Sequence, residues 1–301
     1  LHSFPTRRSS DLTNTKILTA NSVVMVLTNV VLNYILIFGK FGFPALGIAG
    51  AAIASSISEA VSVLFFVIYT WKKIDYKKYG LFRFTRVDFR MLGQILSVSI
   101  WVMIQHGIAF GGWFIFFIAM EHLGERPLAI TNVVRSISSF LFMFVNAFAS
   151  TNSSLVSNLI GAGESDRVLP LCRRMIGLCY AFVLPIGILI AMFPSTVLRI
   201  YTDNPDLIAS SIPSLWVMLS SYLFAVPGFI YFFSVSGTGN TRRALEIDMA
   251  SIFVYVLYIL YVAVWLRADV AVCWTTEYVY NIMILSSFFY LWKGNWRNKK
   301  I

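Results

Sequence analysis

The stretch ILTANSVVMVLTNVVLNYILIF, Ile17–Phe38, holds 22 consecutive residues without a charged side chain. A helix of about 20 apolar residues crosses the hydrocarbon core of a bilayer. Membrane β-strands are shorter, about 9–11 residues, and they alternate apolar with polar positions. This stretch does not alternate in that way, so it is predicted to be a transmembrane helix.

The composition extends this prediction to the whole chain. Of 301 residues, 58% are hydrophobic and 13% are charged, and the mean hydropathy is +0.74. A soluble domain has roughly 25% charged residues, so soluble enzymes, disordered chains, collagens and coiled coils are excluded. We predict an all-α, polytopic transmembrane helical bundle. Seven further apolar runs follow the first: Ala45–Thr70, Leu92–Met120, Asn132–Ile160, Met175–Ile200, Ile212–Val235, Ile247–Leu266 and Cys273–Trp292.

The basic residues indicate how these eight spans are oriented. Alternate connecting segments on one side hold seventeen Lys and Arg residues, and the segments on the other side hold four. Cytoplasmic loops carry this excess of positive charge. We therefore expect a multi-pass protein of the inner (plasma) membrane with the 72–90 linker and the C-terminus in the cytoplasm. The net charge of +10 follows from this arrangement, and no nucleic-acid partner is expected.

Residues 1–12, LHSFPTRRSSDL, differ from everything that follows. They match a translated sequencing adapter, and the alternative is a short basic cytoplasmic terminus. No apolar segment follows the two arginines before a cleavage site, so a signal peptide is excluded. We interpret this segment as an artefact and expect the native sequence to begin near Thr13.

Two short matches indicate an internal repeat. Asn-Thr-Lys at 14–16 precedes the first span, and Asn-Thr-Arg at 240–242 precedes the seventh, 226 residues later. The second and eighth spans both end in Trp-Lys, at 71–72 and 292–293. Polar residues before an apolar run are helix-start signals. The matches therefore predict a six-helix unit that occurs twice.

This repeat predicts a domain organisation. Residues 13–85 would hold the last two helices of an N-terminal lobe and a cytoplasmic linker, and 86–301 a complete six-helix C-terminal lobe. The chain would then contribute eight spans of an expected twelve, in two lobes related by a pseudo-twofold axis. Repeated halves with a substrate path between them are typical of transporters.

Particular motifs resemble the MATE (multidrug and toxic compound extrusion) family. The most specific are NVVLNYILIFG at Asn29–Gly39 and GFPALGIAGAAIA at Gly42–Ala54. Weaker similarities lie in Leu123–Ala129, Leu159–Gly163 and Ser236–Arg242. The resemblance implies an antiporter that exports amphiphilic organic cations through the lipid bilayer in exchange for Na⁺ or H⁺. We expect a monomer with no cofactor other than this coupling ion.

Asn29 and Asn33 are four residues apart and share one face of the first span. Their amide oxygens are able to coordinate Na⁺ or to hydrogen-bond a carboxylic acid. The resemblance implies that such a pair partners an Asp on a helix upstream of this chain. The alternative is that the two amides only join neighbouring helices.

Three further residues are candidates for cation binding or proton coupling. Glu59 is the one carboxylate that the predicted spans place well inside the membrane, where it should be neutral at rest. Gln105 and His106 fall at mid-depth of the third span, and a histidine changes charge between about pH 5 and 8. Each of these residues also has a purely structural explanation as a hydrogen-bonding group.

The Na⁺-driven branch of the resembled family carries a Glu on the helix of His106 and an Asp on the tenth helix of twelve. The corresponding stretches here, Gln105–Gly112 and Phe224–Gly228, contain neither residue. The departure leaves the choice of coupling ion open, and no metal other than Na⁺ is expected.

A polar seam of Asn and Ser residues, spaced mostly by three or four, runs along the fourth span. It predicts either a water-filled cavity or close packing of small side chains. Arg135 has no evident partner on that span, and Glu277 and Asn281 share a face of the last span. The predicted cavity-lining residues are Gln105, Asn132, Arg135, Ser139, Asn146, Glu277 and Asn281.

Two other functions are alternatives to drug export. An intramembrane enzyme lacks support, because neither H-E-x-x-H nor G-x-S-x-G occurs. A lipid-linked oligosaccharide flippase with the same two lobes would be expected to hold diphosphate with several basic residues, and only Arg135 lies well inside a predicted span. An isolated eight-span piece would also be expected to lack a complete transport cavity.

Overall fold

The computed structural model describes residues 15–73, 89–294 and 296. The contacts between residues divide the chain into two units, Leu1–Val87 and Asp88–Ile301. The predicted adapter, Asn14 of the repeat signal and most of the predicted cytoplasmic linker lie outside the described residues. The described residues form helices and turns without strands, as the all-α prediction requires.

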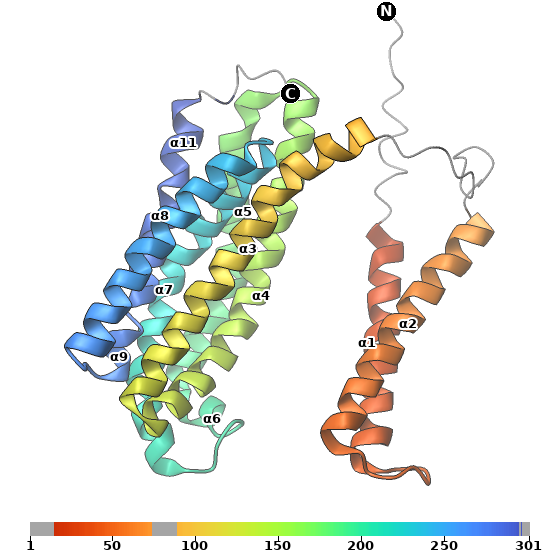
Figure 1. Cartoon of the computed structure of the whole chain (residues 1–301). Helices are drawn as coiled ribbons and strands as arrows, with labels where there is room; N and C mark the ends of the chain where they lie inside the picture. The colour runs from red at the N-terminus through yellow and green to blue at the C-terminus, as the bar shows by residue number, and fades with distance from the viewer. Residues whose placement is uncertain (1–14, 74–88, 295, 297–301) are drawn as a thin grey trace, which may run out of the picture. The chain divides into compact units, whose positions relative to one another are not determined.

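The first unit is a helical hairpin of α1 (Thr15–Phe38) and α2 (Gly47–Lys73), which lie side by side in Figure 1. Two glycines make this hairpin possible. Gly39 has φ +64°, a conformation that side chains disfavour, and a Cβ there would lie 2.6 Å from the backbone nitrogen of Ala45. A Cβ on Gly50 would lie 2.6 Å from the carbonyl oxygen of Leu36. The two helices therefore approach through backbone contact.

The second unit is a bundle of long helices joined by shorter ones (Figure 1). The long helices are α3 (Phe89–Leu123), α4 (Glu125–Gly161), α5 (Val168–Met192), α7 (Pro205–Gly237) and α8 (Thr241–Ile259). The shorter elements are η1 (Ser165–Arg167), α6 (Pro194–Leu198), the π-helical η2 (Leu260–Trp265), α9 (Val270–Cys273), α10 (Thr276–Leu285) and α11 (Ser287–Lys293).

Among the described residues, seven helices are long and apolar enough to cross a membrane. The predicted eighth span, Cys273–Trp292, is helical but divided into short segments. At the first break the backbone bonds tighten, with Thr275 N donating to the Val272 carbonyl and Glu277 N to the Trp274 carbonyl, and Thr275 Oγ1 and Thr276 Oγ1 also donate to the Val272 and Cys273 carbonyls. Such bonds compete with the helical backbone ladder. The last crossing thus consists of α10 and α11 in succession.

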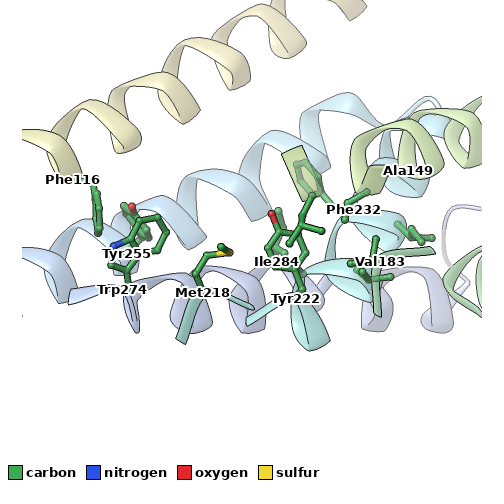
Figure 2. Packing of buried hydrophobic residues seen from close by; sticks show 14 of the residues in the cluster. Phe116, Ala149, Val183, Met218, Tyr222, Phe232, Tyr255, Trp274 and Ile284 are labelled. Carbon is green, nitrogen blue, oxygen red and sulfur yellow. The ribbon is translucent and has the colours of Figure 1, made fainter. Parts of the chain in front are cut away.

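The core of the second unit lies around α4 and α7, which make its most extensive helix contact. Buried apolar residues recur on one face of α4 at helical spacing, as in Val134, Ile137, Leu141 and Val145. Figure 2 shows Met218, Tyr222 and Phe232 among the buried residues of this cluster. The six crossings of this unit therefore enclose a continuous core of their own.

Candidate functional site

A carboxyl group lies buried in the interior of the second unit. Asp248 of α8 is 2% exposed, and its Oδ1 accepts a hydrogen bond of 3.0 Å from Tyr280 Oη on α10. Gln105 of α3 is a second hydrogen-bonding partner, and His106 acts on the carboxyl electrostatically. Three helices thus converge on one acidic side chain.

The position of Asp248 corrects the sequence-based picture of the seventh span. That span was predicted as Ile247–Leu266, which put Asp248 at its edge, whereas α8 begins at Thr241. Seven residues of helix amount to about two turns, or about 10 Å. Asp248 is thus a further acidic residue within a helix of membrane length, which the expectation for Glu59 did not include. Asp248 was missed because it lies at the edge of the predicted span and its partners Gln105 and Tyr280 come from other helices.

Aromatic rings surround the hydroxyl that holds Asp248. The ring of Tyr280 lies 5.9 Å from that of Tyr255 and 6.2 Å from that of Phe229. Tyr255 is 5% exposed, and its hydroxyl has no hydrogen-bond partner among the described residues. Figure 2 shows Tyr255 grouped with Phe116 and Trp274. Little water reaches this part of the bundle, so electrostatic interactions there are strong.

A second carboxylate, Glu277, lies one turn before Tyr280 at the start of α10. It is half-buried and acts electrostatically on the phenols of Tyr222, Tyr255 and Tyr280. The predicted partner on the same face, Asn281, is buried. Thus Glu277 and Asn281 lie within or at the edge of the interior of the unit, with three tyrosines near the carboxylate.

Neither of these carboxylates belongs to an ion pair among the described residues. The ion pairs found there join Glu164 with Arg167, and Glu246 with Arg242 and Arg243. All of these side chains are more than 40% exposed, so the pairs contribute little to stability. Asp248 is consequently a buried acid whose described neighbours offer hydrogen bonds and no paired cation.

The polar seam of α4 lies mainly on the opposite side from the core. Asn132, Ser139 and Asn146 are exposed on the surface of the unit. At the far end of the seam the Ser157 hydroxyl donates to the Gly237 carbonyl at 2.8 Å, so this part packs against α7. Close packing therefore explains the Ser157 end of the seam, and the cavity that Asn132, Ser139 and Asn146 would line stays a prediction.

Arg135 is exposed on the same helix. Its guanidinium lies 4.8 Å from the centroid of the Phe117 ring, a cation–π contact. The ion pairs among the described residues do not include Arg135.

The predicted amide pair forms within the hairpin. Asn33 Nδ2 donates to Asn29 Oδ1 at 2.8 Å, and Asn29 Nδ2 donates to Ser55 Oγ at 3.3 Å. The Oδ1 atom of Asn33 is buried and accepts no hydrogen bond from the described residues. Glu59 on α2 is exposed and does not contribute to this pair. One acceptor therefore remains available next to two amides.

The structure thus brings Gln105 and His106 together with a residue that the sequence analysis missed, and it keeps Asn29 with Asn33. It places Gln105 and Asn281 in the interior and Glu277 at half-buried depth, whereas Asn132, Arg135, Ser139 and Asn146 lie on the surface of the unit. Helices of membrane length that enclose ionisable side chains define a multi-span membrane protein with a candidate ion or substrate pathway.

Comparisons with known proteins narrow this class. The family model MatE matches residues 110–264, just over half of the chain. The "Probable multidrug resistance protein NorM" of Thermotoga maritima is 29% identical over 239 residues, which cover 78% of this chain and 50% of that protein. The "Uncharacterized transporter YisQ" of Bacillus subtilis is 24% identical over 200 residues, covering 63% of this chain and 42% of that protein.

A solved structure shows the same fold. It is described as an outward-facing conformation of a multidrug resistance MATE family transporter of the MOP superfamily. The TM-score is 0.80 at 17% sequence identity, and the match covers 91% of this chain and 61% of that one. The likeness therefore supports the predicted helical architecture and says nothing of substrates.

The chain belongs to the MATE family. This is a family of transporters and not of enzymes. The chain spans about half the length of the curated relatives that it matches.

Proposed function

We propose that the chain forms the larger part of a secondary antiporter that exports amphiphilic organic cations in exchange for Na⁺ or H⁺. The relative from Thermotoga maritima, described as a probable multidrug resistance protein, supports this substrate class. The transporter would act as a twelve-span monomer in the plasma membrane, with its C-terminus in the cytoplasm. The seventeen-to-four distribution of basic residues supports that orientation.

The observation that carries the proposal is the buried acid at Asp248. Antiport requires that a coupling cation and the substrate change each other's affinity. An ionisable group inside a membrane-spanning helix is costly and marks an ion or substrate pathway. A carboxylate in a region of low dielectric attracts a proton, a metal cation or an organic cation, and binding of one weakens attraction for the next.

The hairpin amides would contribute a second contact. The free Oδ1 of Asn33 is suited to accept a hydrogen bond from a carboxylic acid or to coordinate Na⁺. The exposed seam residues of α4 would line the substrate path, since polar side chains on a membrane helix favour water over lipid.

The flippase alternative is not favoured. A diphosphate head group requires charge-assisted contacts from several basic residues. On the membrane-length part of α4 the basic residue Arg135 is engaged with the Phe117 ring, and the acids Asp248 and Glu277 would repel an anionic head group.

Transport by the proposed twelve-span protein tests the function. Everted membrane vesicles would be mixed with ethidium, a fluorescent organic cation, and given a Na⁺ or a proton gradient with the higher concentration inside, in separate experiments. We expect one gradient to drive ethidium across the membrane and the other to have no effect. Vesicles without the protein are the control, and absence of movement under both gradients rejects the antiporter.

A further inference from the structure

We propose that the coupling ion is a proton and that it binds the carboxyl group of Asp248. This inference rests on the proposed antiport and deepens it, because it names the ion and the atom that receives it.

The neighbours of Asp248 suit a proton better than a metal cation. Hard cations such as Na⁺ favour several converging oxygen ligands. Here the phenol of Tyr280 uses its proton to donate to Oδ1, and the other described partners are an amide and an imidazole. A donating hydroxyl and an imidazole are poor ligands for Na⁺. A proton requires no additional ligands and no additional space.

The burial of Asp248 makes the free energy of its charged form higher than that of its protonated form. At 2% exposure, an ionised Asp248 would place an uncompensated charge in the interior of a membrane-spanning bundle. Burying a charge costs far more than burying a neutral acid that is hydrogen-bonded. Binding a proton forms one O–H bond on the carboxylate and removes its charge, and release of the proton restores both.

Groups that face Asp248 come from the helices packed against α8. The imidazole of His106 lies on α3, and the phenol of Tyr280 lies on α10 with the Glu277 carboxylate one turn away. From α7 the uncharged ring of Phe229 packs on Tyr280. None of these groups carries a permanent positive charge, so none replaces the proton as the partner of Asp248.

His106 offers a route for the proton. It is exposed on the surface of the unit, whereas its neighbour Gln105 is buried and contacts Asp248. An imidazole accepts a proton on one nitrogen and releases one from the other. A proton from water would thus pass the exposed His106 before it reaches the buried Asp248.

The unpartnered hydroxyl of Tyr255 is a second, independent sign that this interior binds something. It is buried, lies on the same helix as Asp248 two turns further on, and is acted on by Glu277. Buried hydroxyls without a hydrogen bond are rare and costly. The Tyr255 hydroxyl is therefore free of protein partners among the described residues and lies in the same unit as the two carboxylates.

Transport under separate gradients tests the inference. Proteoliposomes of the proposed twelve-span protein would be given a proton gradient without Na⁺, or a Na⁺ gradient without a pH difference, and ethidium movement would be followed. We expect the proton gradient alone to drive it. Asp248→Asn should reduce this movement about 100-fold, at the upper end of usual coupling. Asp248→Glu, which keeps an ionisable carboxyl, should retain at least about a tenth of it.

Glu246→Gln is the matched control, because this carboxylate lies on the same helix in an exposed ion pair. The transport rate of this variant should stay within about twofold of the rate of the unaltered protein. Tyr280→Phe removes the hydrogen bond that favours the ionised carboxylate, so the pH midpoint of transport should move up by about one unit. A merely structural role of Tyr280 would change the rate and leave the midpoint in place.

Two results overturn the inference while the antiport stands: movement driven by Na⁺ alone, or full proton-driven movement in Asp248→Asn. If neither gradient moves ethidium, the proposed function fails, and proton release decides the inference separately. Tetraphenylphosphonium added to the purified chain should then release protons that a pH indicator detects. Release that Asp248→Asn abolishes supports proton binding at Asp248, and absence of release, or release that Asp248→Asn keeps, overturns it.

Discussion

The two units of this chain differ in how many of their residues they bury on their own. In the hairpin, 11% of the most apolar stretch of α1 is buried within the described structure, and the same share holds for α2. In α7 the buried share of that stretch is 56%. The hairpin accordingly carries its amides half-buried on a two-helix surface. The six-crossing unit encloses an acid, phenols and an indole inside a core of its own.

The difference separates two kinds of chemistry. Amides such as Asn29 and Asn33 bind ions or acids without changing their own charge. A buried carboxyl such as Asp248 changes charge whenever it gains or loses a proton, and low dielectric amplifies the effect on its surroundings. We therefore assign binding contacts to the hairpin and ion coupling to the larger unit.

A pair of tryptophans gives the largest expected contrast in stability. Trp274 is fully buried in the six-crossing unit, and Trp71 on α2 is 77% exposed. Trp274→Ala should lower the free energy of unfolding by about 3–5 kcal/mol, because it leaves a cavity. Trp71→Ala should change it by at most about 0.5 kcal/mol. Unfolding in detergent followed by circular dichroism measures both, and equal losses would contradict the contrast in packing.

Two glycines test how firmly each unit holds its helices. A Cβ on Gly237 of α7 would lie 2.5 Å from the Ser153 carbonyl oxygen, and one on Gly50 would lie 2.6 Å from that of Leu36. Gly237→Ala should cost about 1–3 kcal/mol, because several helices fix its neighbours. Gly50→Ala should cost less, since within the hairpin α1 is held by α2 alone. The same unfolding assay ranks the two, and a larger loss for Gly50→Ala would show that the hairpin is the stiffer unit.

The amide pair distinguishes binding from coupling. Replacing both Asn29 and Asn33 by Ala should raise the KM for ethidium about tenfold, equivalent to about 1.4 kcal/mol. The pH midpoint of transport should not move, because amides do not titrate. Asn21→Ala is the matched control, since Asn21 lies two turns earlier and donates to Ser62 Oγ at 2.8 Å. A shifted midpoint in the double variant would assign proton coupling to the hairpin instead.

The smallest effect concerns two tyrosine hydroxyls in the larger unit. Tyr255 Oη has no described partner, whereas Tyr258 Oη lies 2.9 Å from Thr275 Oγ1. Tyr255→Phe should raise the free energy of unfolding by about 1 kcal/mol, and Tyr258→Phe should lower it by a similar amount. Thermal unfolding in detergent measures both signs. A loss of stability in Tyr255→Phe would mean that its hydroxyl is hydrogen-bonded, for example through water.

Periodicity and charge predicted most of the fold. Long uncharged runs define the membrane helices, because a bilayer leaves no alternative way to satisfy the backbone. The break in the last span could not be predicted, since it is a local change of backbone hydrogen bonding around Thr275 and Glu277. Hydropathy averages are insensitive to such local competition.

The candidate site was predicted only in part. The four-residue spacing of Asn29 and Asn33 placed the amides on one face, and their contact is local. The partners of Asp248 come from Gln105 and Tyr280, which are 143 residues earlier and 32 residues later along the chain. Spacing along one helix carries no information about which residues of other helices it meets, so this cluster required the tertiary structure.

Infrared difference spectroscopy of the purified chain shows whether the larger unit buries a carboxyl group that exchanges a proton. Spectra at acidic and alkaline pH would be subtracted, and the carbonyl stretch of protonated carboxylic acids compared between variants. We expect a carbonyl band of a protonated carboxylic acid that Asp248→Asn removes and Glu246→Gln keeps. An unchanged carbonyl region in Asp248→Asn would contradict it.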